Sequence, residues 1–246
     1  MTAGLNSRAL LCFMKDKFFA LIAAHLAVIL FLGLALPLIA AEAPSSIDVS
    51  NFSSVSPSGN LPGQWDLQTF PSIDAHTEYS IVTDKRYGLV IRAEAAGSAA
   101  GLVRKISVDP QEYPILAWSW KVSKTLDGSS LANRQGDDFP ARILVSFGGD
   151  LFGTTAGRTL CYVWATVEPV ETMMKSPYHK GVVTIVASSG DSTVGRWQEV
   201  RRNIAEDYLK AYGEMPESLR AIALLSDSDN TADHVVAWYG PISLNK

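Results

Sequence analysis

Between residues 78 and 239 the sequence repeats one pattern, in which short runs of β-branched, aromatic and other apolar residues alternate with turn residues. Runs of this length and composition predict β-strands. They occupy residues 78–83, 88–93, 101–108, 115–122, 141–147, 159–167, 181–187, 196–201, 219–226 and 235–239. About ten strands with little helix predict an all-β fold, a two-sheet antiparallel β-sandwich of the jelly-roll-like kind.

One short helix is predicted at an edge of the sandwich. Asn203 is suited to cap its N-terminus, and Glu206 three residues later is the matching partner of a capping box. Gly213 and Pro216 are the signals that end it. One face repeats every four positions, at Ile204, Tyr208 and Tyr212. We therefore expect a connecting helix packed on the sandwich, and not an α/β fold.

Side-chain alternation predicts which strand residues face the core. Trp118 and Trp120 share one face of their strand, which we expect to be core, with a ligand-stacking platform as the alternative. In residues 159–167 a small apolar set containing Cys161 opposes an aromatic set containing Trp164. An aromatic face that also carries threonine suits a half-exposed surface, so Cys161 is expected to point inward and Trp164 to be exposed.

The N-terminal segment sets the expected compartment. Lys15 and Lys17 precede an apolar run over residues 18–39, and small residues follow it. This order is that of a secretory signal peptide, while the run is also long enough for a membrane anchor. Residues 1–43 are predicted to be one or the other. The remainder is expected to be exported, as a periplasmic protein or one anchored in the inner membrane and facing the periplasm.

The exported part is expected to comprise a loose lead-in over residues 44–63 and a single β-sandwich domain over residues 64–246. Without residues 1–43, the chain keeps 18 basic and 23 acidic side chains. This acidic balance, with no run of Lys or Arg, argues against a nucleic-acid partner. Cys161 is the only cysteine in the exported part, so no intrachain disulfide forms there.

An acidic turn separates the last two predicted strands, with oxygen-bearing side chains at Asp227, Asp229 and Asn230. Closely spaced oxygen donors in a turn can bind Ca²⁺, which takes six to eight oxygen ligands. The spacing is not that of an EF-hand loop. A solvated turn whose side chains bond their own backbone is one alternative, and a ligand-binding or catalytic role is another.

A second charged group lies at the start of the run at 141–147. Asp137 and Asp138 are adjacent, and Arg142 follows four residues after the second carboxylate. Because successive strand residues point to opposite faces, the two carboxylates are not expected to form one dyad. One of them is expected to pair with Arg142 or Arg202, to stabilise the fold or to grip a polar ligand. A general acid–base pair is a third alternative, and it needs a second carboxylate roughly 5–10 Å away, from the other acidic turn.

Aromatic side chains supply a third set of candidates, because flat rings on a sheet face bind the apolar faces of sugars. Trp164 and Trp197 are the rings that we expect a ligand to contact. Trp197 lies between Arg196 and Gln198, a mixed edge that suits saccharide recognition or a core anchor. The predicted ligand-binding residues are therefore Asp137, Asp138, Arg142, Trp164, Trp197 and Arg202.

Short motifs spread from about residue 52 to residue 242 resemble one protein family. They include His76-Thr77-Glu78-Tyr79, Tyr113-Pro114-Ile115-Leu116-Ala117-Trp118-Ser119-Trp120, Gly136-Asp137-Asp138-Phe139-Pro140-Ala141-Arg142, Gly195-Arg196-Trp197 and Asp227-Ser228-Asp229-Asn230-Thr231. As a set they resemble the bacterial domain-of-unknown-function family 3047 (DUF3047). The resemblance implies a single exported domain and brings no established activity with it.

These features together favour an exported, non-catalytic binding module of the bacterial envelope, whose partner is an envelope glycan or another polar small molecule. One alternative is a glycan hydrolase or lyase that uses the carboxylates of the two acidic segments. The other is a structural or interaction module of the envelope. No cofactor is predicted apart from Ca²⁺ at the acidic turn, and membrane contact is expected only through the N-terminal segment.

Overall fold

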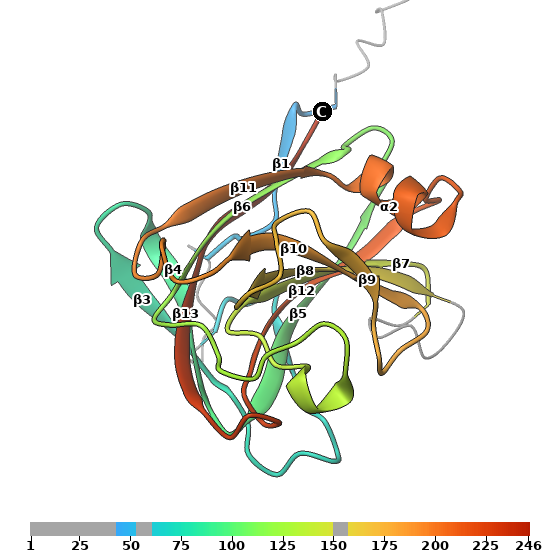
Figure 1. Cartoon of the computed structure of the whole chain (residues 1–246). Coiled ribbons are helices and arrows are strands. Elements are labelled where there is room, and N and C mark those ends of the chain that lie inside the picture. Colours follow the sequence, from blue (N-terminus) through green and yellow to red (C-terminus); the bar gives the residue numbers. More distant parts are fainter. Residues whose placement is uncertain (1–42, 53–60, 150–156) are drawn as a thin grey trace, which may run out of the picture. The chain divides into compact units, whose positions relative to one another are not determined.

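The computed structural model describes residues 43–52, 61–149 and 157–246. The chain divides into two units, Met1–Ala43 and Pro44–Lys246, and the described residues of the second unit form a two-sheet β-sandwich (Figure 1). The apolar run predicted to be a signal peptide or anchor lies outside the described residues. Within the described ranges, no helix has the length and apolar character that a membrane crossing requires.

The first sheet has six strands. Its order is β11 (Gln198–Asn203), β6 (Ile115–Val122), β13 (His234–Asn245), β4 (Gly88–Ala96) and β3 (Glu78–Asp84), and β1 (Ser46–Asp48) also pairs with β13. All of these pairs are antiparallel. The long strand β13 therefore holds this sheet together, because it pairs with β4, β6 and β1.

The second sheet has seven strands. Its order is β2 (Asp66–Gln68), β5 (Ala99–Val108), β12 (Leu219–Asp227), β7 (Arg142–Phe147), β8 (Arg158–Ala165), β10 (Val182–Ser189) and β9 (Met173–Lys175). The prediction of a two-sheet all-β sandwich with one helix is confirmed. Each predicted strand is present, with its ends shifted by a few residues in most cases and further in β13.

One pair in the seven-stranded sheet departs from the predicted antiparallel arrangement. Strand β10 runs parallel to β8, with Val182 opposite Thr159. The connecting residues 166–181 form β9 on the way, and β9 pairs antiparallel with the outer side of β10. Alternating side chains mark the faces of a strand but not its direction relative to a neighbour, so the sequence pattern does not distinguish the two pairings.

The predicted edge helix is confirmed as α2 (Ile204–Tyr212). The side chain of Asn203 accepts a hydrogen bond from the backbone N–H of Glu206 at 3.1 Å, as a capping residue does. Gly213 ends the helix in the left-handed conformation, with φ of 79°, and its N–H donates to the Leu209 carbonyl. The helix packs against β8 and β11.

The core between the sheets is rich in aromatic rings. Trp118 and Trp120 of β6 are buried, as predicted, and they meet β8 from the opposite sheet. The ring centroids of Trp118 and Tyr162 are 5.2 Å apart, and those of Trp120 and Trp164 are 6.1 Å apart. The indole N–H of Trp164 donates to the Gly190 carbonyl at 3.2 Å. The predicted exposure of Trp164 is wrong, since the side chain is fully buried in this core.

The seven-stranded sheet is also buried on its other face. Cys161, Val163 and Ala165 point away from the inter-sheet core. They pack with Leu131 and Phe139 of residues 123–141, the covering segment that connects β6 to β7. Cys161 is therefore buried, as predicted, but on the outer side of the sheet. Alternation failed in β8 because both of its faces are buried, and each then carries apolar side chains.

We expect Trp164→Ala to lower the unfolding free energy by about 3–5 kcal/mol, because removal of a fully buried indole leaves a cavity between the sheets. Urea denaturation followed by far-UV circular dichroism measures the change. Trp238→Ala removes an indole that is only partly buried, and it should cost clearly less. Equal losses in the two variants would contradict the assignment of Trp164 to the core.

Candidate functional site

A cavity of about 440 Å³ lies on the outer face of the seven-stranded sheet. Its floor is made by outward-facing side chains of four adjacent strands, Leu225 of β12, Leu144 of β7, Cys161 of β8 and Thr184 of β10. Its walls come from three connecting segments, residues 70–73, 176–179 and 229–230. The volume falls within the range of roughly 300–1,000 Å³ that is usual for small-molecule sites.

Arg142 and its two carboxylate partners form the charged end of this cavity. The Arg142 guanidinium donates to both oxygens of Asp227, at 3.0 Å from Nε and 2.5 Å from Nη2. Its Nη1 donates to Asp137 Oδ1 at 3.0 Å, and its Nη2 also donates to the Asp137 carbonyl. Both ion pairs are almost fully buried, so each carboxylate has exchanged solvent for the guanidinium.

The covering segment, which carries Asp137 and Asp138, is held in place by close backbone contacts and hydrogen bonds. A Cβ atom at Gly136 would lie 2.6 Å from the Gly128 carbonyl oxygen, so only glycine permits this close approach of the two backbones. The Ser129 hydroxyl donates to the Asp138 carbonyl at 2.7 Å. The backbone N–H of Phe139 donates to Asp227 Oδ1 at 2.9 Å, which fixes this segment against the end of β12.

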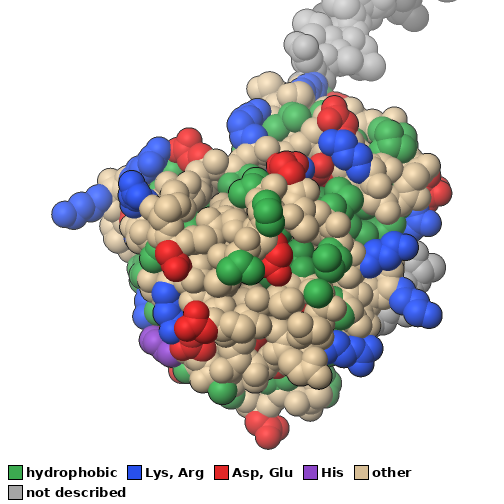
Figure 2. All heavy atoms as spheres, viewed as in Figure 1, with side chains coloured by type: hydrophobic (Ala, Val, Ile, Leu, Met, Phe, Trp, Pro, Cys, Tyr) green, Lys and Arg blue, Asp and Glu red, His purple; other side chains and the backbone are tan. Residues whose placement is uncertain are grey.

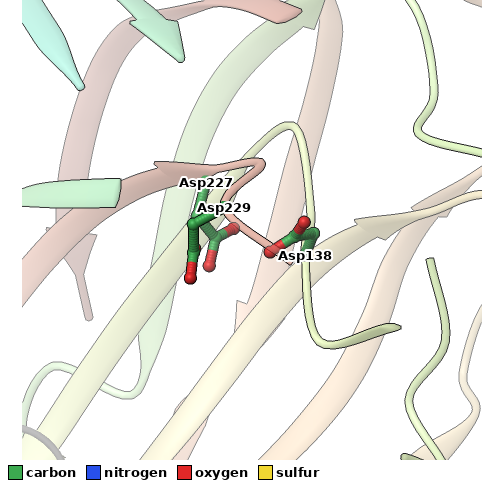
Figure 3. A group of neighbouring side chains, drawn as sticks. All are labelled: Asp138, Asp227 and Asp229. Carbon is green, nitrogen blue, oxygen red and sulfur yellow. The ribbon is translucent and has the colours of Figure 1, made fainter. Parts of the chain in front are cut away.

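Asp138, Asp227 and Asp229 meet at this point, where Asp227 and Asp229 project side by side and Asp138 approaches from the neighbouring segment (Figure 3). Each offers one oxygen within 4.8 Å of the others, a grouping that can hold a metal ion. Asp138 already accepts hydrogen bonds from Asn230 Nδ2 at 2.9 Å and from the Thr231 N–H at 2.6 Å. The sequence predicted Asn230 as a possible Ca²⁺ ligand, whereas in the structure its side-chain amide N–H donates to Asp138.

Burial shifts the proton affinity of several groups in the cavity. It raises the pKa of the Asp227 carboxyl to about 7; Arg142 opposes this rise, and the charge of Asp138 adds to it. Burial, followed by the charge of Asp138, also raises the pKa of Asp229. Burial raises the pKa of the Cys161 thiol to about 12, so this thiol remains protonated at neutral pH.

Among the described residues, the side chains of Thr184 and Asp229 in the cavity have no hydrogen-bond partner on another residue. Thr184 is 5% exposed and points to the cavity side of β10, because its neighbours Val183 and Ile185 face the inter-sheet core. No hydrogen bond forms at its hydroxyl within the described part of the chain. Among the described residues, the Asp229 carboxylate accepts a hydrogen bond only from its own backbone N–H. Both groups are therefore available to a ligand.

Two aromatic rings, those of Tyr178 and Phe70, also line the cavity. Tyr178 is 41% exposed, and its hydroxyl donates to the Arg134 carbonyl at 3.1 Å and to Asn230 Oδ1 at 3.3 Å. The Arg134 guanidinium lies over the Tyr178 ring, 5.1 Å from its centroid. Phe70 lines the cavity from the segment between β2 and β3. The cavity thus combines an apolar floor and aromatic walls with a charged end.

The fold brings together only part of the predicted ligand set. Asp137, Asp138 and Arg142 join the acidic turn, as the general acid–base alternative required, but the remaining three residues lie elsewhere. Trp164 is in the core, and Trp197 is half-buried on the six-stranded sheet, where its N–H donates to Asp84 Oδ2. Arg202 lies next to α2 and pairs with Asp207 and with Glu171, so of the two arginines predicted as partners of Asp137 or Asp138 it is Arg142 that forms the pair.

Sequence reasoning missed the residues that shape the cavity, namely Phe70, Tyr178 and Thr184. Tyr178 lies in a Ser-Pro-Tyr-His segment that reads as an ordinary turn. Thr184 lies in an otherwise apolar run, Val182-Val183-Thr184-Ile185-Val186. A single hydroxyl residue within such a run was the one available signal, because a polar side chain in a strand buried on both faces needs a partner.

The sequence family described as "Protein of unknown function (DUF3047)" matches residues 63–243. The chain belongs to this family. The resemblance that its motifs predicted is confirmed, and the match spans all but the first few and last few strand residues of the sandwich. No curated protein matches the sequence.

Solved structures show a weaker similarity. The family 11 carbohydrate-binding module of a cellulosomal cellulase of Clostridium thermocellum is 10% identical, with a TM-score of 0.43 over 82% of this chain and 95% of that one. A family 30 carbohydrate-binding module of another cellulosomal cellulase of Clostridium thermocellum is 15% identical, with a TM-score of 0.41 over 81% and 98% of the two chains. At these TM-scores the similarity assigns neither a fold nor a function to the chain.

We expect Arg142→Met to lower the unfolding free energy by about 3–5 kcal/mol, because it leaves the buried carboxylates of Asp137 and Asp227 without a counter-charge. The matched control is Arg86→Met, which breaks the solvent-exposed pair with Glu199 and should cost only about 0–1 kcal/mol. Denaturant unfolding at neutral pH measures both. Similar losses in the two variants would contradict the structural role of Arg142.

A pH dependence follows from the raised pKa of Asp227. Between about pH 4, near the value of an unfolded-chain aspartate, and about pH 7, the native state holds this proton more tightly than the unfolded state does. The Asp227 contribution to stability therefore falls as the pH rises through this window. Asp227→Asn removes the titrating group, so the unfolding free energy of the wild type minus that of the variant should decrease from pH 4 to pH 7. A constant or increasing difference in denaturant titrations would rule this out.

Proposed function

We propose that the sandwich is an exported, non-catalytic binding module that takes a carbohydrate or another polar small ligand in the cavity over the seven-stranded sheet. The observation that carries this proposal is that the side chains of Thr184 and Asp229 have no hydrogen-bond partner on another described residue and line a cavity with an apolar floor and an aromatic wall. The Thr184 side chain is almost fully buried and its hydroxyl opens into the cavity, so a ligand there can supply the hydrogen-bond partner that the described residues do not supply.

The chemistry of the cavity suits a sugar. Pyranose rings carry apolar faces that pack on aromatic and aliphatic side chains, and here Tyr178, Phe70 and Leu144 supply such surfaces. Sugar hydroxyls donate and accept hydrogen bonds around the ring edge; here carboxylates line the charged end, and the Thr184 hydroxyl lies at the floor. A ligand that is apolar on its faces and polar around its edge matches this arrangement better than a uniformly apolar one does.

Binding is favoured over hydrolysis by the way in which the carboxylates are held. A glycosidase pair flanks the scissile bond, with carboxyl groups about 5–10 Å apart. Here Arg142 binds both oxygens of Asp227, and Asp138 accepts two hydrogen bonds, so neither carboxylate is free to act on a bond. This arrangement supports a positioning role for Asp227 and Asp138, and it leaves Asp229 to face a ligand.

The cavity also separates this proposal from that of a structural or interaction module of the envelope. A flat apolar patch would favour a protein partner, because interfaces of that kind bury broad surfaces. On the face shown in Figure 2, acidic and basic side chains are interspersed, with no large patch of a single sign. That distribution, like the net charge, offers nothing that suits nucleic acid.

The proposed location is the bacterial envelope, either free in the periplasm or anchored in the inner membrane. Its support is the order of Lys15, Lys17, the apolar run and the small residues that follow it, which is that of an export signal. Glycans are abundant in that compartment, and the N-terminal segment is the proposed route of any membrane contact.

Calcium at the acidic turn remains a sequence prediction. The three carboxylates have the chemistry that Ca²⁺ prefers, but Arg142 already neutralises Asp227, and amide donors occupy Asp138. We therefore propose that positive charge reaches Asp229 with a ligand and not from a resident Ca²⁺ ion.

We expect Tyr178→Ala to weaken the binding of oligosaccharides about 5- to 10-fold, because it removes an aromatic wall while leaving the sheet intact. A glycan array identifies the ligand, and isothermal titration calorimetry measures the change. Tyr87→Ala is the matched control, since it removes a partly exposed tyrosine that lies against Trp197 of the other sheet. The absence of any glycan binding by the folded wild-type domain would refute the proposed function.

A further inference from the structure

Negative charge predominates around the cavity. Its charged end gathers the carboxylates of Asp137, Asp138, Asp227 and Asp229 around the single guanidinium of Arg142. Four of the five N–H groups of Arg142 are directed to Asp137 and Asp227, so this guanidinium has little to offer an anionic ligand. A carboxylated or phosphorylated sugar would meet uncompensated negative charge there.

The groups that remain available define what a ligand has to supply. The Asp229 carboxylate is an acceptor when ionised, and it calls for a donor or a cation. The Thr184 hydroxyl both donates and accepts, and it lines the floor of the cavity with no hydrogen-bond partner among the described residues. One group therefore selects charge, and the other selects a hydroxyl or an amide.

The positions of these two groups set the length of the ligand. Thr184 lies on β10 and Asp229 is the second residue after β12, with β7 and β8 between these strands. Three inter-strand spacings amount to about 14 Å across the sheet. A ligand that meets both groups is therefore an extended one of more than one sugar ring, lying across β12, β7, β8 and β10.

Building on the proposed function, we propose that the cavity binds an amino-sugar oligosaccharide, whose protonated amine pairs with Asp229 and whose next ring bonds the Thr184 hydroxyl. Arg142 acts as a positioning residue, because its guanidinium holds Asp227 and Asp137 in place. Since these two residues occupy it, the guanidinium is not available to bind an anionic glycan. The apolar floor at Leu144 and Cys161 lies beneath the sugar rings.

The test compares two oligosaccharides with the same sugar backbone, β-1,4-linked glucosamine oligomers, which carry charged amines, and their N-acetylated counterparts, which carry neutral acetamides. Titration calorimetry is carried out at about pH 6, where the amine is protonated. EDTA is present, so that no signal comes from a bridging metal ion. We expect the wild type to bind the amine form about 10-fold more tightly, the difference that one charge-assisted hydrogen bond makes. Asp229→Asn should abolish this preference, whereas Asp66→Asn, which removes an exposed carboxylate that does not line the cavity, should preserve it.

Thr184→Val tests the second contact, since it keeps the shape of the side chain and removes the hydroxyl. It should weaken the binding of the amine and N-acetyl forms by a similar factor of about 5, because the strength of a neutral hydrogen bond to Thr184 does not depend on the charge of the amine. Equal affinity of the wild type for both oligomers, or an unchanged preference in Asp229→Asn, would overturn this inference while leaving glycan binding intact. Binding of a simple diamine as tight as that of the amino oligosaccharide would overturn its sugar component. Binding of no oligosaccharide at all would instead count against the proposed function.

Discussion

The organisation of this protein depends on one constraint, that the seven-stranded sheet carries apolar side chains on both faces. One face packs against the six-stranded sheet through a layer of aromatic rings, in which Trp120 meets Trp164. The other face has to be shielded from water by connecting segments, and Leu131 and Phe139 provide part of that cover. The cover leaves a cavity over four of the strands, and the candidate site lies there. The site therefore follows from the way in which the sheet is buried.

Burial under these segments also explains the electrostatics. Arg142 enters the sheet at the start of β7 and points to the covered face, where an unpaired guanidinium would be costly. Asp227 at the end of β12 and Asp137 in the covering segment supply its counter-charges, so one buried cation ties two distant parts of the sequence together. Asp229 lies next to this network without an ion-pair partner in the described part of the chain. A fixed network beside a free carboxylate can orient a ligand without reorganising.

The sequence identified the strands well, and it identified side-chain orientation only where one face of a strand is wet. Trp118 and Trp120 were assigned to the core correctly, because polar or small residues alternate with them in β6. Trp164 was assigned to the surface, since β8 has two apolar faces and alternation then gives no direction. Arg202, the alternative partner predicted for Asp137 or Asp138, pairs elsewhere for a different reason. Its partners Asp207 and Glu171 come from α2 and from the β8–β10 connection, and charge pairing between segments follows from topology and not from spacing.

The sequence by itself determined the all-β class, the edge helix with its cap, the family, and the two acidic segments that carry the charged residues. These features are local, because strand period, capping and turn chemistry depend on residues a few positions apart. Only the tertiary structure decided that the acidic segments meet, that β10 runs parallel to β8, and that Tyr178 and Thr184 line one cavity with Asp229. Each of these depends on which strands become neighbours, and that choice is made by the burial of whole sheet faces, which no short stretch of sequence records.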